Sequence, residues 1–501
     1  MSFLRRFTDA ITLEESDGMK NKDLVPIPID RRKWGFPAYL WYWGITSLCA
    51  VTWSAGSSLL SLGLNGNYAM GIVVIANAII SIAAALNGYY ASRYHIGFSV
   101  YQRVIFGIRG SCIGVLIRAI LSVVWFASQA WLGGLCVNVI LSSWSKSYLN
   151  WENTLPESVP MTSQELCGFV IYLVLTFPLL MVPPQYLDSL LAVATFMIFF
   201  MGIGITAWAV HFNGNNYGSL MNEKMSLSSS DMGWAWMYGL SSWYSSLTSG
   251  IANQGDYSRY NKSTKGCMYG IVLGTNLTGF LVPLFGILTA SAFGAMDLAS
   301  LCPRFLNIRR GSVLVMLLAW PTQPWLFYNS DSVFLTVISS FSVFLTPLIA
   351  IYICDFYVIR RCKLKISHCY ISSKESIYWY NNGINWRSII SFAVGVAPGL
   401  PGLINAANPS ISISSGALHF FQGSFIFQFA ISFCVHYALN LFLNETVGEP
   451  DKTDLFNTYK PAECKHYNLI PYSTTNSTDP AIGASEKVFS EEEIRTVESV
   501  H

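Results

Sequence analysis

The chain has 501 residues, of which 52% are apolar and only 12% are charged, and its mean hydropathy is +0.41. So few charges cannot cover the surface of a water-soluble protein of this length, and the sequence therefore predicts an integral membrane protein. The net charge of +2 is small, no basic tract with interleaved aromatic residues occurs, and the eleven cysteines lack metal-type spacing, so we expect neither a nucleic-acid partner nor a metal site.

Residues 1–36 form a polar segment of mixed charge without the apolar core of a cleavable signal peptide, and we expect this segment in the cytosol. Residues 37–443 form the predicted membrane domain. Its apolar segments are each close to the length of about 20 residues that a membrane-spanning helix needs, and a helix satisfies its own backbone hydrogen bonds in lipid. The eleven segments are 38–60, 69–88, 114–141, 165–183, 189–211, 232–252, 267–293, 312–328, 333–354, 388–408 and 421–443.

The short loops rich in lysine and arginine should face the cytosol. The basic loops at 89–111, 253–266 and 355–366 place the N-terminus and, up to the sixth span, the even-numbered loops inside. Two cytosolic loops must be separated by an even number of spans, yet only the apolar run 267–302 separates the loop at 253–266 from the basic loop at 302–310. That run is shorter than the roughly 40 residues that two helices and a turn require. A re-entrant hairpin, an inverted topology or an absent helix would each explain the count.

The C-terminal segment, residues 444–501, contains eleven acidic and five basic residues. This composition predicts a solvated, disordered tail. Both termini are candidate contact sites for ubiquitin or trafficking machinery in the cytosol.

Two of the predicted spans are unusually rich in glycine, serine and threonine. The first reads WGITSLCAVTWSAGSSLLSLGL and the sixth reads WAWMYGLSSWYSSLTSGIANQ, and each begins a possible five-helix half. Paired, interrupted helices of this kind are typical of inverted-repeat transporters, whose binding site lies between the breaks. The alternative is that the small residues only allow close helix packing.

The third span contains the run WFASQAW, in which Trp125 and Gln129 are four residues apart and share one helix face. An aromatic ring one turn from an amide suits a planar, polar heterocycle, which can stack on the ring and hydrogen-bond to the amide. Trp131 lies about 200° round the helix from Gln129, so we predict that it is a packing residue. We expect Arg118, two turns before Trp125, to extend to the cytosolic surface.

The sequence NQGDYSRY ends the sixth span and contains Asp256 and Arg259. These two residues either pair in a cytosolic gate or serve as a helix cap and a positive-inside charge. The chain has no clustered histidines, no Walker loop, no HExxH and no nucleophile elbow, so we expect neither an enzyme nor a bound cofactor.

The chain resembles the nucleobase:cation symporter-1 family, specifically its fungal uracil, uridine, allantoin and thiamine permease group. Within that group it is most similar to the thiamine branch, which includes nicotinamide riboside permeases. The stretches that carry the resemblance are NKDLVPI at 21, TWSAGSSLLSLGL at 52, WFASQAWLGGLCVN at 125, NQGDYSRY at 253, GAMDLASLCPRFLNIRRG at 294, ICDFYVIRR at 353 and NWRSIISFAVGVAPGLPG at 385.

The resemblance implies an all-α integral membrane protein with a leucine-transporter-like inverted five-helix repeat, two C-terminal helices and twelve spans. It implies a plasma-membrane symporter that imports thiamine or a related heterocyclic compound by alternating access. Uracil, uridine or allantoin is the alternative substrate. The family's eighth helix is not found here: its last residues and the loop after it are present, but its body should fall between Ser291 and Gly294. This leaves about eleven spans and opens a further alternative, a transport-incompetent sensor or truncated gene product. Because the absent helix would supply sodium ligands, we expect proton coupling.

The resemblance also implies roles for individual residues. Trp125 corresponds to the family's substrate-stacking tryptophan and Gln129 to its hydrogen-bonding partner. Thr52 and Trp53 fall in the break of the first helix, and Asn253 corresponds to a polar residue of the sixth. Tyr244 is a further substrate-binding candidate, because its ring could contact a cationic ligand. Asp256 and Arg259 are the candidates for a cytosolic gate. Leu247 replaces an aromatic residue of the nucleobase permeases, which favours thiamine or a pyridine nucleoside over uracil.

Overall fold

A computed structural model describes residues 19–20, 23–47, 62, 64, 66–156, 161–212, 227–277, 331–408, 410–442 and 447–472 of the chain. Throughout these ranges the regular elements are helices, together with three isolated β-bridges. The α-helices are α2 (Phe36–Ser47), α4 (Gly66–Tyr94), α5 (Phe98–Phe106), α6 (Ser111–Trp144), α7 (Lys146–Leu149), α8 (Ser163–Thr176), α9 (Asp188–Phe212), α10 (Ser229–Ser258), α11 (Thr264–Leu277), α14 (Asp331–Ile353), α15 (Trp386–Val396), α16 (Leu400–Ala407), α17 (Ser415–Gln422), α18 (Ser424–Phe442) and α19 (Pro461–Tyr467).

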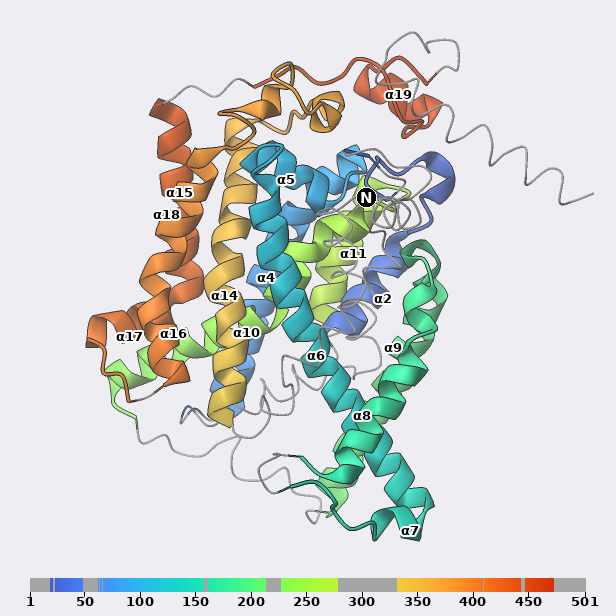
Figure 1. Ribbon diagram of the computed structural model, residues 1–501, viewed down its shortest axis with the longest axis vertical. Coiled ribbons are helices and arrows are strands. Elements are labelled where there is room, and N and C mark those ends of the chain that lie inside the picture. Colours follow the sequence, from blue (N-terminus) through green and yellow to red (C-terminus); the bar gives the residue numbers. More distant parts are fainter. Residues whose placement is uncertain are drawn as a thin grey trace, which may run out of the picture.

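The helices form a bundle in which α10 packs against both α4 and α14 (Figure 1). Helices α15 and α18 pack on α14, and α8 packs on α6. Six helical stretches in the described ranges are long and apolar enough to cross a membrane, which agrees with the predicted membrane protein. They begin at Gly71, Ser111, Ser163, Ser339, Trp386 and Ser424. The junction at Ser291–Gly294 and the predicted span 312–328 lie outside the described residues, so the count of eleven spans stays a prediction.

Helix α10 is continuous from Ser229 to Ser258, so the predicted break in the sixth span is wrong. Its hydroxyl side chains bond back to carbonyl oxygens of the preceding turn: Ser245 Oγ donates to Ser241 O at 2.6 Å, and Thr248 Oγ1 donates to Tyr244 O at 2.8 Å. These polar residues are therefore satisfied without unwinding the backbone. The first span remains untested, because α2 ends at Ser47 and residues 48–61 are outside the described part.

The C-terminal half of α10 is held by short contacts with α2 and α4. Trp43 of α2 donates to Gln254 Oε1 at 2.7 Å, and Asn87 of α4 donates to Ile251 O at 2.6 Å. Gly88 allows this approach, because a Cβ there would lie 2.7 Å from the Gln254 side chain. The packing thus fixes the position of the helix that carries Asn253 and Asp256.

Residues 447–472, here called the C-terminal strap, fold against the end of the bundle at which α4 and α14 end (Figure 1). These residues belong to the predicted tail 444–501, and specific partners connect them to the rest of the chain. Arg32 donates to both carboxylate oxygens of Glu463, at 2.8 and 2.9 Å, and also to Thr458 O at 2.9 Å. Asp451 accepts two hydrogen bonds from Ser367. The acidic composition did not predict the contacts of the strap, because the partners of its individual acidic residues lie on segments that are distant in the sequence. Residues 473–501 lie outside the described residues.

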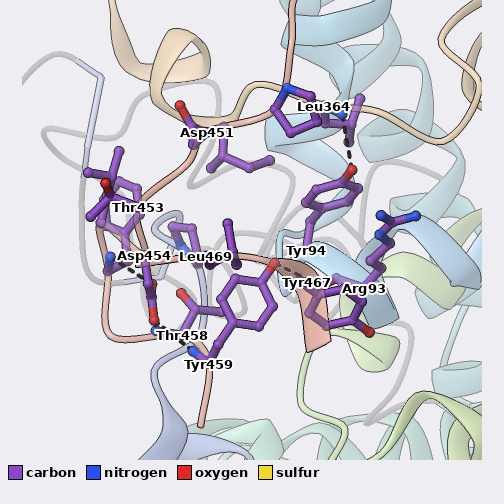
Figure 2. Close-up of a pocket in the computed structure, with 15 residues that line it drawn as sticks. Arg93, Tyr94, Leu364, Asp451, Thr453, Asp454, Thr458, Tyr459, Tyr467 and Leu469 are labelled. Carbon is purple, nitrogen blue, oxygen red and sulfur yellow. Dashed lines mark hydrogen bonds between the residues drawn. The ribbon is translucent and has the colours of Figure 1, made fainter. Parts of the chain in front are cut away.

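Figure 2 shows a cavity of about 120 Å³ between the strap and the ends of the membrane helices. Asp454 shapes the strap by accepting backbone hydrogen bonds from residues 456, 458 and 459. Tyr459 donates to Arg93 O at 3.0 Å, and Tyr94 donates to Cys362 O at 2.7 Å. The strap therefore contacts the end of α4 through Tyr459, and α4 contacts the loop after α14 through Tyr94.

Candidate functional site

The face of α6 that carries Trp125 and Gln129 is buried in the bundle. Trp125 is 8% exposed, and its ring meets Phe341 of α14 edge-on, with centroids 5.5 Å apart. Gln129 is fully buried, and neither its Oε1 nor its Nε2 has a hydrogen-bond partner among the described residues. An unpaired buried polar group costs about 1–3 kcal/mol, so this amide is a strong candidate for contact with a ligand.

The opposite side of α6 packs against α8. Trp131 lies edge-on to Phe169 at 5.6 Å, which confirms the prediction that it is a packing residue. Gly134 makes this packing possible, since a Cβ there would come within 2.6 Å of Phe169 Cα. Helix α6 is thus oriented by α8 on one side and directs Trp125 towards α14 on the other.

Tyr244 and Asn253 are both buried on α10 but do not meet. The ring of Tyr244 lies 5.2 Å from that of Phe425 on α18, whereas Asn253 Oδ1 lacks a hydrogen-bond partner in the described part of the chain. Nine residues of continuous helix separate them, which places them about 180° apart and about 13.5 Å along the axis. No hydrogen bond or ring contact between described residues joins either one to the α6 pair. Thr52 and Trp53 are outside the described residues, and the binding roles of all these residues stay predictions.

Asp256 of α10 binds Arg118 of α6. Its Oδ2 accepts from Arg118 Nη2 at 2.5 Å, and its Oδ1 accepts from the backbone N–H of Phe98 at 3.0 Å. Both charged side chains are about 2% exposed, so the expected extension of Arg118 to the cytosolic surface is wrong. The partner on α10 and the Phe98 ring, 3.5 Å from the guanidinium carbon, keep Arg118 inside.

Arg259 lies next to this pair and binds the N-terminal segment. Its guanidinium donates to Asp23 O at 2.7 Å, to the Tyr260 hydroxyl at 3.1 Å and to Asp256 O at 3.3 Å. Together Arg118, Asp256 and Arg259 connect α6, the C-terminal end of α10 and the segment before α2. The sequence analysis did not predict this arrangement. The position of Arg118 inside a predicted span was the available signal, because a charge inside a membrane span needs a partner.

Two titratable side chains outside the membrane spans, Glu463 and His95, have shifted pKa values. Partial burial acts to raise the pKa of Glu463, but the hydrogen bond and charge of Arg32 outweigh it and hold this pKa below its ordinary value. Burial, aided by the charge of Arg32, lowers the pKa of His95 to about 3. His95 is therefore neutral at physiological pH and holds Arg259 O through its Nδ1 at 2.9 Å. No group of three or more metal-ligating side chains occurs over the described ranges.

Comparison with known proteins identifies the family. A family profile described as "Permease for cytosine/purines, uracil, thiamine, allantoin" matches residues 26–297 and 293–427. The chain belongs to this permease family. Nicotinamide riboside transporter 1 of Saccharomyces cerevisiae is 35% identical, with 91% of this chain and 85% of the relative aligned. The thiamine transporter THI72 of the same yeast is 34% identical over the same shares. The family consists of membrane transporters rather than enzymes, which confirms that prediction.

Among solved structures, the chain is similar to Mhp1, a nucleobase-cation-symport-1 family transporter with bromovinylhydantoin bound. The TM-score is 0.65 at 17% identity, with 89% of this chain and 99% of Mhp1 covered. An inward-facing structure of Mhp1 matches with a TM-score of 0.64. This likeness confirms the predicted leucine-transporter-like fold class.

The same comparisons show where the chain departs from its relatives. The two segments matched by the family profile meet at residues 293–297. The alignment with the nicotinamide riboside transporter has 511 positions, whereas 91% of 501 residues is about 456, so about 55 positions of that alignment have no residue in this chain.

Proposed function

We propose that this permease is a symporter that imports thiamine or a related heterocyclic compound, such as a pyridine nucleoside, across the plasma membrane by alternating access. Its N-terminus is cytosolic and protons are the coupling ion. The observation that carries the substrate class is the buried pair on α6, in which the unpartnered amide of Gln129 lies one turn from the ring of Trp125. Two relatives named for nicotinamide riboside and thiamine support the same class.

The chemistry of the α6 face suits a flat cationic ring. Thiamine and nicotinamide riboside each carry a positively charged heteroaromatic ring, which an indole attracts by about 0.5–2 kcal/mol depending on desolvation. The Gln129 amide can donate to one edge group and accept from another. Thr52, Trp53, Tyr244 and Asn253 are further candidates for the site. Uracil, uridine and allantoin have no such charge, and they remain the alternative substrates.

The cytosolic gate of this transporter is proposed to include Asp256 and Arg259, with Arg118 as the partner of the Asp256 carboxylate. Opening towards the cytosol would separate α6 from α10 and would expose the buried ion pair to water. As the pair separates, water hydrates each charge, and this hydration free energy offsets the lost attraction between the two charges. The pair can therefore open and close reversibly.

Uptake of labelled substrate tests the proposal. Yeast cells lacking their own thiamine and nicotinamide riboside transporters should accumulate labelled thiamine or nicotinamide riboside when they express this chain. Trp125→Ala and Gln129→Ala should each reduce uptake at least tenfold at equal surface expression. Trp144→Ala is the matched control, because Trp144 ends the same helix and is 82% exposed. Uptake no greater than that of empty-vector cells contradicts the proposal, and stronger competition by uracil, uridine or allantoin than by thiamine favours the alternative substrates.

A second candidate is a transport-incompetent sensor or the product of a truncated or mis-spliced gene. It is favoured by the meeting of the two matched segments at 293–297 and by about 55 alignment positions without a residue in this chain. An absent eighth helix would remove one wall of the site. Sequencing the transcript across the codons for Ser291 to Gly294 distinguishes the two candidates. A longer open reading frame that restores uptake identifies this chain as the shortened product.

A further inference from the structure

A second buried group of charged side chains lies where α14 meets α18, away from the α6 face. Helix α14 continues into a π-helical turn, Cys354–Ile359, that carries Asp355. His436 of α18 faces this turn, with its Nε2 3.8 Å from Asp355 Oδ1, and both side chains are fully buried. The π-helical turn is a local irregularity of the kind that is frequent at functional sites.

The carboxylate of Asp355 is satisfied on one oxygen only. Its Oδ2 accepts from Arg360 Nε at 2.7 Å and from the Tyr101 hydroxyl of α5 at 3.5 Å. Its Oδ1 has no hydrogen-bond partner among the residues that the structure describes. Since buried polar atoms are nearly always paired, this oxygen is an open acceptor next to the imidazole.

The hydrogen bonds of His436 indicate where a proton would add. Ser391 has one hydroxyl hydrogen, and its Oγ lies 2.8 Å from Arg387 O but 3.4 Å from His436 Nδ1. The shorter contact takes the hydroxyl hydrogen, so Ser391 Oγ accepts from Nδ1–H. In the neutral ring Nε2 then has no hydrogen, and it faces the equally hydrogen-free Oδ1 of Asp355. One added proton at Nε2 would convert this contact into a charge-assisted hydrogen bond after a small approach.

Further charged and hydrogen-bonding groups surround the pair. Arg360 already neutralises Asp355, and Arg387 of α15 donates to Asn440 Oδ1 at 2.9 Å, while Asn440 Nδ2 lies 3.4 Å from His436 Nε2. The titratable and charged groups around the pair are Cys354 and Arg360 after α14, Tyr101 of α5, Arg387 of α15, Cys434 of α18, Tyr378, whose ring lies against Arg360, and Tyr380, which accepts from Arg360.

We propose that His436 and Asp355 form the binding site of the coupling proton, an inference that rests on the proposed proton-driven import. A proton from water binds His436 Nε2, ties α18 to the π-helical turn through Asp355 Oδ1, and returns to water when the two elements separate. The link to substrate is α14 itself, because Phe341 on the same helix contacts Trp125. Phe341 and Asp355 are fourteen residues apart, about 21 Å along the helix. A shift of α14 therefore acts on the substrate ring and the proton site together.

The first test measures proton binding without transport. Purified protein, the His436→Gln variant and the His466→Gln control are unfolded thermally in detergent at pH 5.5 and pH 7.5. His466 is exposed on the C-terminal strap, so it controls for the loss of any histidine. The stability lost in His436→Gln should be greater at pH 5.5, because only the natural residue can form the charged hydrogen bond. An equal loss at both pH values overturns the proposal. If His436→Gln does not fold, Ser391→Ala replaces it, and the expected result is an altered pH dependence of unfolding.

The second test measures coupling in vesicles that contain a pH-sensitive dye. Labelled thiamine added outside should enter with protons in vesicles carrying the natural protein. His436→Gln should still exchange thiamine across the membrane, but its ratio of protons to thiamine should fall at least tenfold. An unchanged ratio overturns the coupling role of His436 alone. Absence of any thiamine entry with the natural protein contradicts the proposed function as well, so the two failures are distinguishable.

Discussion

The ion pair between Arg118 and Asp256 permits a quantitative prediction, because both partners are buried and their contacts are known. Replacing Arg118 by alanine removes its bond to the buried Asp256 carboxylate, whose Oδ1 still accepts from the backbone N–H of Phe98. Removing one partner of a buried pair typically costs about 3–5 kcal/mol, mainly because the other charge is left without compensation. Loss of the stacking on Phe98 and of the bond to Ala252 O acts in the same direction.

A surface ion pair provides the matched control. Lys363 and Glu449 are 3.3 Å apart, but their side chains are 47% and 80% exposed. Breaking an exposed pair of this kind costs about 0–1 kcal/mol. Lys363→Ala should therefore leave the unfolding transition nearly unchanged, while Arg118→Ala should lower it strongly.

The assay is thermal and denaturant unfolding of the purified variants in the same detergent. The double variant Arg118→Leu, Asp256→Leu completes the comparison, because replacing both charges by apolar groups is often close to neutral. It should recover most of the stability lost in Arg118→Ala. If Arg118→Ala is within about 1 kcal/mol of Lys363→Ala, the Asp256 carboxylate is hydrated and the reasoning from burial is refuted.

Two further predictions concern the strap and the packing of α6. The pKa of Glu463 is below its ordinary value in the folded protein. Its bond to Arg32 therefore stabilises the fold fully at pH values above the ordinary carboxyl pKa of about 4.3, and this stabilisation is lost as the pH falls through the folded-state pKa. Protection of residues 447–472 against hydrogen exchange, relative to the intrinsic exchange rate at each pH, should fall on acidification below pH 4. Glu463→Gln should show low protection already at pH 7 with a smaller change on acidification, and identical pH profiles of protection would exclude this bond as the anchor of the strap. Gly134→Ala would place a Cβ 2.6 Å from Phe169 Cα and should cost at least 1–3 kcal/mol, whereas Gly233→Ala meets no atom within 4 Å and should be neutral or slightly stabilising. Thermal unfolding of both variants measures this difference, and equal stability would show that α6 and α8 can separate without loss.

The sequence by itself determined the membrane class, the positions of most helices and the family. Hydropathy suffices for these, because lipid requires long apolar helices whatever their neighbours are. The predicted segment 114–141 lies inside α6, for example, and the predicted segment 165–183 covers most of α8. Helical periodicity also placed Trp125 and Gln129 on one face and Trp131 on another, since the angle between side chains depends only on their spacing.

Only the tertiary structure decided which polar groups are paired. Arg118 binds a residue 138 positions away, and Arg32 binds Glu463 at a separation of 431 positions. Composition averages over such partners, so it predicted an exposed arginine and a disordered strap. The continuity of α10 was also decided by tertiary structure. A serine-rich helix can either satisfy its hydroxyl groups internally or unwind, and packing against neighbouring helices selects between the two. The unpaired amide of Gln129 and the open oxygen of Asp355 likewise became visible only when every neighbouring atom had a position.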